Sequence, residues 1–506
     1  MTQAGQCLKN GNSKTIYPNV PVVISLSLIG WNKLFSIIFI LFSHQQISAM
    51  KRCLYWLLGI IIITTSACQN TTTTGEQGTA AHPTGDSGLK HPEWILQGNI
   101  YEVNVRQYTT EGTFKAFQAN LDRLKEMGVQ TLWFMPINPI SIKDRKGTLG
   151  SYYAVSNYTQ VNPEFGDMND WKALVKAAHD KGFKVIIDWV ANHTGADHVW
   201  LTSHPDFYVK DSSGNAKIAF DWSDTRQLDH SNTAMGDSMI EAMRYWITES
   251  DIDGFRCDVA GTVPTTFWKR CIGSLQKQKP LFMLAEGDTV ALHHAGFNAT
   301  YPWNMFQMMK KIAKGERPAF AIDSIRMQTD SIYPADAIRM YFTSNHDENS
   351  WNGADYETMP GAVHAPFAVY TQTAGRSVPL IYSGQEEPVL RKVEFFERDP
   401  LRMGKFKRAQ FYKTLLSLRA RNPALAANSK FSKVVVGNER ALYAFVREHG
   451  TNRVLVILNL SASEQTITVK DKGLYATPMN LFLGNKEPVS DKPFNIEPWG
   501  YIIYEY

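Results

Sequence analysis

The chain has 506 residues, enough to bury a large core and to form two or three domains. Its formal net charge at pH 7 is only +4, so the composition gives no indication of a nucleic-acid partner. No pair of its five cysteines has metal-ligand spacing, and we expect no disulfide framework.

The N-terminal region contains a targeting pattern. A basic start at residues 50–52 precedes an apolar run at residues 54–63 and small residues before Cys68, as in a secretory signal peptide. With cysteine at the cleavage site, it resembles a bacterial lipoprotein signal, which implies that Cys68 is lipidated in the cell envelope. The alternative is a transmembrane helix, for which the run is too short. We interpret residues 50–67 as the signal peptide and residues 1–49 as a gene-start artefact, with a membrane anchor as the rival interpretation of the latter.

Alternating strand and helix patterns follow a polar stretch, residues 68–92, which we expect to be a flexible tether. The expected strands are 100–108, 130–136, 183–190, 254–258, 281–286, 297–300, 338–343 and 378–382, and the clearest helices are 114–128, 167–182, 237–250, 304–315 and 407–422. Eight strand–helix pairs over about 330 residues predict a (β/α)₈ TIM barrel at residues 93–423, with a small insertion at about 194–230 after strand three. An open doubly wound sheet would carry a Gly-rich phosphate turn after its first strand, and none is present.

Past Pro423 the pattern changes to strands alone. Alternating runs such as 441–448 and 452–461 are joined by turns at His449-Gly450 and Lys472-Gly473. This pattern predicts a separate all-β domain, a β-sandwich at residues 424–506.

Catalytic groups in a (β/α)₈ barrel lie at the carboxyl ends of its strands. Arg256 and Asp258 point to one face of the fourth expected strand because side chains alternate, whereas Cys257 points to the other face as a small buried hydrophobe. The arginine is expected to lower the pKa of Asp258 and keep it ionised, as a nucleophile requires. A purely structural ion pair is the alternative.

Other strand ends would bring more polar groups into the same bowl, namely Asp188, Asn192, His193, Glu286, Asn345, His346 and Asp347. Carboxylates held close together raise one another's pKa, so at least one should stay protonated near neutral pH. One ionised and one protonated carboxyl are what retaining glycoside hydrolysis uses. A divalent metal is the competing use of such a cluster, but no HxH or HExxH spacing occurs, so we expect no catalytic metal.

Ordered blocks of the sequence resemble the α-amylase family of glycoside hydrolases, from about residue 97 to the end of the chain. The blocks are GSYYAVSNY at 150–158, VNPEFG at 161–166, DWVANH at 188–193, GFRCD at 254–258, AE at 285–286, FTSNHD at 342–347 and PLIYSGQE at 379–386. Each block is short, but their order on the expected strands makes the match specific.

The resemblance implies the principal catalytic roles. Asp258 would be the nucleophile that forms a covalent glycosyl intermediate, and Glu286 would be the general acid and then the base. Asp347 would bind sugar hydroxyls and favour the distorted ring. Asn192 matches a calcium ligand of the family, which implies a structural calcium ion.

The resemblance also assigns supporting residues. Arg256 would hold Asp258 ionised, and His193 and His346 would donate hydrogen bonds to substrate hydroxyls. Tyr153 would stack beneath the sugar, and Asp188 would tie the strand ends together. Several tryptophans are candidates for sugar platforms, with core packing as the alternative: Trp133, Trp189, Trp222, Trp303 and Trp351.

We therefore expect a lipid-anchored, monomeric enzyme on the periplasmic or cell-surface side that hydrolyses α-1,4-glucosidic bonds in starch or maltodextrins. Val259 and Ala260 depart from the pattern of many α-amylases, and Val259 also occurs in relatives that accept α-1,6 links or short maltodextrins. A neopullulanase, a cyclomaltodextrinase, an α-1,6-acting enzyme or a transferase is the alternative within this chemistry. A non-catalytic sugar-binding lipoprotein is disfavoured because Asp258, Glu286 and Asp347 are all present.

Overall fold

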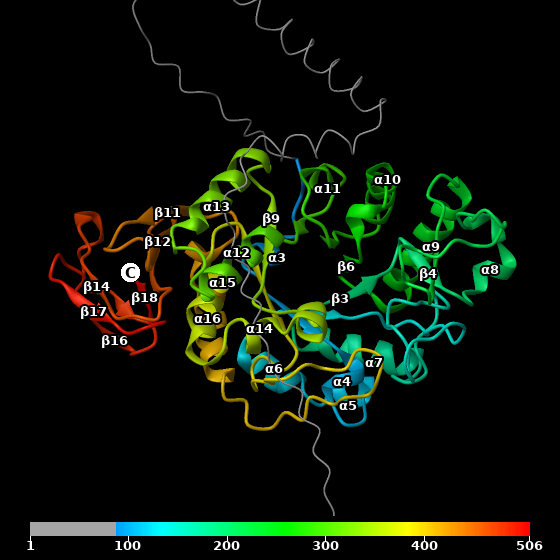
Figure 1. Cartoon of the computed structure of the whole chain (residues 1–506), viewed down its shortest axis with the longest axis horizontal. Helices are drawn as coiled ribbons and strands as arrows, with labels where there is room; N and C mark the ends of the chain where they lie inside the picture. The colour runs from blue at the N-terminus through cyan, green and yellow to red at the C-terminus, as the bar shows by residue number, and fades with distance from the viewer. Residues whose placement is uncertain (1–87) are drawn as a thin grey trace, which may run out of the picture. The chain divides into compact units, whose positions relative to one another are not determined.

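The structure is a computed structural model that describes residues 88–506 (Figure 1). The expected signal peptide, the lipidation site Cys68 and most of the expected tether lie outside the described residues. Within residues 88–506, eight parallel strands close into a barrel in the order β1-β10-β9-β8-β7-β6-β3-β2. This arrangement confirms the predicted (β/α)₈ barrel.

The barrel elements follow the predicted order with shorter bounds. The strands are β1 (Ile100–Val103), β2 (Thr131–Phe134), β3 (Lys184–Trp189), β6 (Gly254–Cys257), β7 (Phe282–Ala285), β8 (Ala299–Thr300), β9 (Ile338–Tyr341) and β10 (Ser377–Tyr382). The helices are α3 (Glu93–Leu96), α4 (Val105–Tyr108), α5 (Phe114–Gln118), α6 (Leu121–Met127), α7 (Met168–Asp180), α9 (Thr233–Ser250), α10 (Thr265–Leu275), α11 (Val290–His294), α12 (Trp303–Ala313), α13 (Ala321–Ile332), α14 (Ala354–Glu357), α15 (His364–Thr373) and α16 (Ala409–Arg421).

Helix α7 shows how sequence determines one barrel unit. Asp167 and Asp170 form a capping box at its N-terminus, which satisfies backbone N–H groups that have no partner within the helix. Its buried face is Trp171, Leu174, Val175 and Ala178, and the following strand β3 is buried from Val185 to Trp189. The apolar helix stripe and the largely apolar strand therefore pack together as the sequence predicts.

Two expected elements differ from the structure. The first strand ends at Val103, and α4 follows, because the Gln107 side-chain amide donates to the backbone carbonyls of Glu394 and Glu397 instead of extending the sheet. The helix expected over 114–128 is divided near Asn120, whose side-chain amide donates to the Ala116 carbonyl. A polar side chain that bonds its own backbone competes with a continuous helix.

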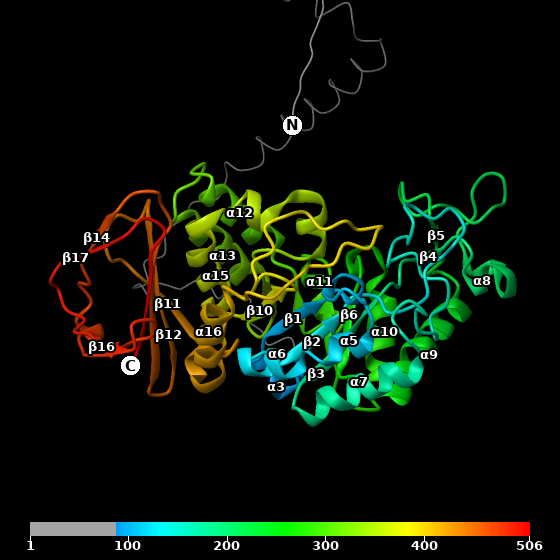
Figure 2. The same ribbon diagram turned by 90° about the horizontal axis from the view of Figure 1, so that it is seen from below.

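An insertion lies between β3 and α9, and it contains β4 (His193–Gly195), α8 (Val199–Ser203) and β5 (Thr225–Gln227). Strands β4 and β5 pair antiparallel, and the insertion lies beyond β3 and β6 in both views (Figures 1 and 2). It therefore adds a wall at the carboxyl end of the barrel strands, where a site is expected.

The C-terminal residues form two antiparallel sheets, which confirms the predicted all-β region. One sheet contains β11 (Lys430–Val434), β12 (Leu442–His449), β13 (Asn452–Asn459), β18 (Tyr501–Glu505), β15 (Met479–Asn480) and β16 (Asn485–Lys486), and the other pairs β14 (Gln465–Ile467) with β17 (Phe494–Ile496). An apolar cluster that includes Val446, Leu455 and Ile496 lies between the sheets.

A second apolar cluster joins the C-terminal sheet to the barrel, because Phe367 and Leu415 of barrel helices share it with Phe445 and Val456. The fully buried Arg447 guanidinium reinforces this contact by donating to several backbone carbonyls, including those of Thr373 and Ala426 at 2.7 Å each. Among residues 88–506, the helices are all too short or too polar to cross a membrane.

Candidate active site

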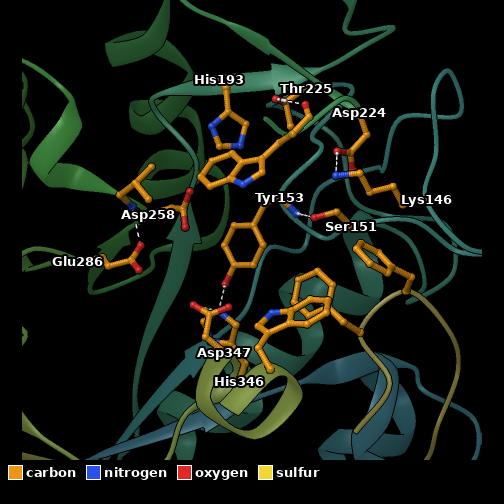
Figure 3. Close-up of a pocket in the computed structure, with 15 residues that line it drawn as sticks. Lys146, Ser151, Tyr153, His193, Asp224, Thr225, Asp258, Glu286, His346 and Asp347 are labelled. Carbon is orange, nitrogen blue, oxygen red and sulfur yellow. Dashed lines mark hydrogen bonds and ion pairs between the residues drawn. The ribbon is translucent and has the colours of Figure 1, made fainter. Parts of the chain in front are cut away.

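A cavity of about 470 Å³ opens at the carboxyl ends of the barrel strands (Figure 3). The residues predicted to act on or bind substrate all line it, namely Tyr153, His193, Asp258, Glu286, His346 and Asp347. Asp188 and Arg256 lie buried beneath them. The structure therefore brings together residues that are separated by up to almost two hundred positions in the chain.

Arg256 on β6 is the centre of this arrangement. One of its terminal nitrogens lies 2.9 Å from Asp188 Oδ1 and 3.0 Å from Asp258 Oδ1, and the other lies 2.9 Å from Glu286 Oε2. Its Nε donates to the Tyr301 hydroxyl at 3.2 Å. A single buried guanidinium thus fixes three carboxyl groups, and the rigid planar fork of arginine suits this role better than lysine would.

Strand register explains why the carboxyls of Asp258 and Glu286 are neighbours. Cys257 on β6 pairs with Ala285 on β7, so Asp258 and Glu286 follow at the same level. Val259 then adopts a left-handed conformation with φ of 35°, which is strained for a β-branched residue. This turn directs the Val259 N–H to Glu286 Oε2, 2.6 Å away.

Asp258 and Glu286 share their electrostatic surroundings. Burial and the neighbouring Glu286 carboxylate raise the pKa of Asp258 well above its usual value. Although burial opposes it, the Arg256 charge and the Val259 N–H lower the pKa of Glu286, as does a hydrogen bond from Asp258. Arg256 lowers the pKa of both carboxyls, as the sequence indicates for Asp258, while burial raises both.

The shared guanidinium limits how far apart the two carboxyls can lie, and thereby the chemistry of the site. An inverting glycosidase keeps its carboxyls far enough apart to hold a water molecule between one of them and the sugar. Here Asp258 Oδ1 and Glu286 Oε2 lie 3.0 and 2.9 Å from the two terminal nitrogens of the same guanidinium, which holds the carboxyls side by side. The geometry favours direct attack by one carboxylate on a sugar, followed by hydrolysis of the covalent intermediate.

His346 forms a second charged group at the cavity. Its Nδ1 contacts the carboxylate of Glu102 on β1, and its Nε2 lies 2.8 Å from the Tyr153 hydroxyl and 3.4 Å from Asp347 Oδ2. Although burial disfavours the charge, Asp347 and Glu102 raise the pKa of His346 to about 9. An imidazolium ion therefore lies beside the sugar site at neutral pH.

His193 and Tyr153 complete the substrate surface. Burial lowers the pKa of His193 to about 4, so its imidazole is neutral and can both donate and accept hydrogen bonds. The Tyr153 hydroxyl donates to Asp188 Oδ2 at 3.1 Å, which fixes the orientation of its ring. Asp188 also accepts from Trp133 Nε1 at 3.3 Å and thus has the supporting role that the sequence indicates.

Asn192 does not fit the expected role as a calcium ligand. Its Oδ1 accepts hydrogen bonds from Gln227 Nε2 and from Thr262 Oγ1, both at 3.1 Å, so the two lone pairs of this oxygen are engaged. Within residues 88–506, no group of three or more His, Cys, Asp or Glu side chains is arranged to hold a metal ion. The reaction described below requires no catalytic metal.

Comparisons with known proteins show which family the chain resembles. The family model "Alpha amylase, catalytic domain" matches residues 70–220, and "Alpha-amylase SusG C-terminal domain" matches residues 442–503. "Alpha-amylase MalA" of Haloarcula japonica is 25% identical over 78% of this chain, which spans 59% of that relative's length. A cyclomaltodextrinase of Thermoanaerobacter pseudethanolicus is 24% identical, with 75% of this chain and 73% of the relative covered. The crystal structure of an α-amylase from Lactobacillus plantarum has a TM-score of 0.74 and 28% identity, with 82% and 99% covered.

The chain belongs to the α-amylase family of glycoside hydrolases. The resemblance stated from the sequence blocks is thereby confirmed, and so are the barrel fold and the enzyme class. In this α-amylase family member, the blocks at 188–193, 254–258, 285–286 and 342–347 all end at the one cavity.

Sequence reasoning missed several residues of this α-amylase site. Glu102 lies within β1, where the run IYEV indicated only an alternating strand. Lys146, Asp224 and Phe396 line the cavity from loops that have no periodic pattern. Among the tryptophans considered as sugar platforms, Trp222 and Trp351 line the cavity, whereas Trp133 and Trp189 are fully buried in the core.

Proposed function

We propose that this enzyme hydrolyses α-1,4-glucosidic bonds in starch or maltodextrins with retention of anomeric configuration. The observation that carries the proposal is the pair Asp258 and Glu286, which line one cavity and are held side by side on the two terminal nitrogens of one guanidinium. Retention requires this close spacing, because one carboxylate must reach the anomeric carbon without an intervening water molecule.

The proposed reaction has two displacements. In the first, the Glu286 carboxyl donates its proton to the glycosidic oxygen while the Asp258 carboxylate forms a bond to C1 and the leaving sugar departs. Glu286, now ionised, then takes a proton from water, whose oxygen bonds to C1 and releases Asp258. Asp347, His346 and His193 would bind hydroxyls of the ring over Tyr153, and their interactions would strengthen as the ring flattens.

The test follows the anomeric configuration of the products. Proton NMR of maltoheptaose hydrolysis should show the α-anomer first, with the β-anomer appearing only by mutarotation; initial β-anomer would contradict the mechanism. Asp258→Asn and Glu286→Gln should each lose at least about 10³-fold in kcat, because the groups act as a unit. Lys413→Ala is a control, because Lys413 pairs with Glu126 on the outer helices.

A cyclomaltodextrinase or neopullulanase activity, or action on α-1,6 links, is the second candidate. It is supported by Val259-Ala260 after Asp258 and by the similarity to the cyclomaltodextrinase described above. Incubation with amylose, pullulan and cyclodextrins separates the candidates. Faster release of panose or maltose from pullulan or cyclodextrins would favour the second candidate, whereas faster hydrolysis of amylose would favour the first.

We also propose that the enzyme is a monomer anchored in the cell envelope through lipidated Cys68. The support is the order of basic, apolar and small residues before that cysteine. Radiolabelled fatty acid should enter the full chain and not a Cys68→Ser variant. Size-exclusion chromatography with light scattering on the chain from residue 88 should give the monomer mass.

A further inference from the structure

One end of the cavity is lined by an ion pair. Lys146 Nζ lies 3.1 Å from Asp224 Oδ1, and these residues come from the loop after β2 and from the insertion. In Figure 3 the pair lies across Tyr153 from Asp258 and Glu286. The Asp224 side chain is only 3% exposed, so leaving it unpaired would be costly and the contact is held in place.

Further contacts join the same two segments. Arg226 of the insertion lies 2.6 Å from Asp144 Oδ2 in the loop after β2. The carboxylate of Asp197 in the insertion accepts the backbone N–H groups of Ile142 and Lys143 at 2.8 and 2.9 Å. Several independent contacts therefore keep the Lys146–Asp224 pair from opening as an isolated surface salt bridge would.

A third loop, after β10, extends this barrier. Its Glu397 carboxylate accepts the backbone N–H of Thr148 at 2.7 Å, and the Leu149 N–H donates to the Phe396 carbonyl at 3.0 Å. The Phe396 ring lines the cavity and lies 5.8 Å from the ring of Trp351, centroid to centroid. We call this barrier the end wall, and it consists of Lys146, Gly147, Thr148, Asp224, Phe396 and Glu397.

Chemistry fixes which part of the substrate faces the end wall. Glu286 must reach the oxygen on C1, so the leaving sugar lies on the Glu286 side. The retained glucosyl ring lies over Tyr153, and in an α-1,4-glucan the chain continues from its O4, on the side of the ring opposite C1. Lys146 and Asp224 lie across Tyr153 from Asp258 and Glu286 in Figure 3, so the non-reducing part of the chain would run towards the end wall.

We propose that the end wall makes this enzyme act at the non-reducing ends of α-glucans and release short products. The inference rests on the proposed function and adds its mode of attack. A cleft that cuts within a chain must be open at both ends, whereas here three loops joined by hydrogen bonds and ion pairs border the retained side. The volume of about 470 Å³ is that of a small-molecule pocket, which suits a short oligosaccharide rather than a passing polymer.

The test compares maltoheptaose with the same sugar carrying a 4,6-O-ethylidene group on its non-reducing glucose. The ethylidene group should clash with the end wall, and each 1.4 kcal/mol of unfavourable interaction slows cleavage tenfold. We therefore expect the blocked sugar to be cleaved at least about tenfold more slowly than maltoheptaose. Equal rates on both sugars would overturn the inference and leave the proposed function standing. Cleavage of neither sugar would overturn the proposed function and this inference with it.

A matched pair of lysine variants tests the end wall itself. Lys146→Ala should raise cleavage of the blocked sugar relative to maltoheptaose and lengthen the products from amylose. Lys413→Ala is the control, because Lys413 is 37% exposed and pairs with one carboxylate, as Lys146 does at 35%. If the Lys146→Ala variant does not fold, the Asp224→Asn variant, which removes the other partner of the ion pair, is used for the same comparison. An unchanged ratio in a folded end-wall variant would contradict the inference.

Discussion

The contact between Glu102 and His346 allows the charge at the sugar site to be tested directly. Substituting Glu102→Gln removes a negative charge and nearly preserves the side-chain shape. The side chains of His346 and Glu102 are 2% and 0% exposed, so solvent screens their interaction weakly. Burial lowers the pKa of His346, and the carboxylates of Asp347 and Glu102 together raise it to about 9.

The expected magnitude follows from these opposing effects. Asp347 remains in the Glu102→Gln variant, so we expect the pKa of His346 to fall by about one to two units, or about 1.4–2.7 kcal/mol. The pKa of His346 in the folded protein lies above the ordinary value of 6.5. The contribution of charged His346 to the free energy of unfolding is therefore fully present below about pH 6.5. It is lost as the pH rises through about 9 in the wild type. The loss should occur at lower pH in the variant.

Histidine ring NMR on ¹³C- and ¹⁵N-labelled protein would measure this pKa, with the His346 signal assigned from a His346→Gln variant. The kcat/KM profile should lose activity on its alkaline side in the Glu102→Gln variant, and Glu102→Asp should restore part of it. Glu102 acts through His346 and is a positioning residue. An unchanged His346 titration midpoint in the Glu102→Gln variant would refute the electrostatic account.

Three further predictions concern other parts of the site. Arg256→Gln leaves buried carboxyls without their counter-charge, so the free energy of unfolding, measured with urea at pH 7.5, should fall by about 3–5 kcal/mol. At pH 5 more of the carboxyls are protonated, and a fall that is no smaller there would contradict this cause. Val259→Gly removes the backbone strain of a β-branched residue in the left-handed conformation, and this gain offsets the greater chain entropy of glycine in the unfolded state. The free energy of unfolding should therefore change by less than about 1 kcal/mol. A larger loss would show that the packing of the valine side chain contributes more to stability than the backbone strain costs. Because Asn192 is engaged by protein donors, EDTA should change neither the thermal midpoint nor kcat; a fall in the midpoint that added calcium reverses would reveal a calcium site elsewhere.

The sequence predicts the barrel and the main site residues because both depend on short-range patterns. Arg256 and Asp258 follow from alternation along one strand, and Glu286 and Asp347 follow from the rule that catalytic groups lie at strand ends. The capping box at Asp167 is similarly local. Such features require no knowledge of which distant segment lies opposite.

The remaining features depend on pairing between distant segments. Glu102 meets His346 across 244 positions of the chain, and nothing in the first strand indicates a charged partner. The end wall depends on Lys146 finding Asp224 and on Thr148 finding Glu397. The sharing of Arg256 among three carboxyls could not be predicted either, because it depends on how β3, β6 and β7 lie together in the folded barrel.

The buried Arg447 has a consequence for protein engineering. From β12 its guanidinium donates to the carbonyls of Thr373 and Ala426, which both precede β11, and Phe445 and Val456 share an apolar cluster with barrel helices. Cutting the chain before β11 would leave those carbonyls and that apolar surface exposed to water. The C-terminal sheets are therefore not an exchangeable module, and a chimera that replaces them must also redesign the contacting faces of α15 and α16.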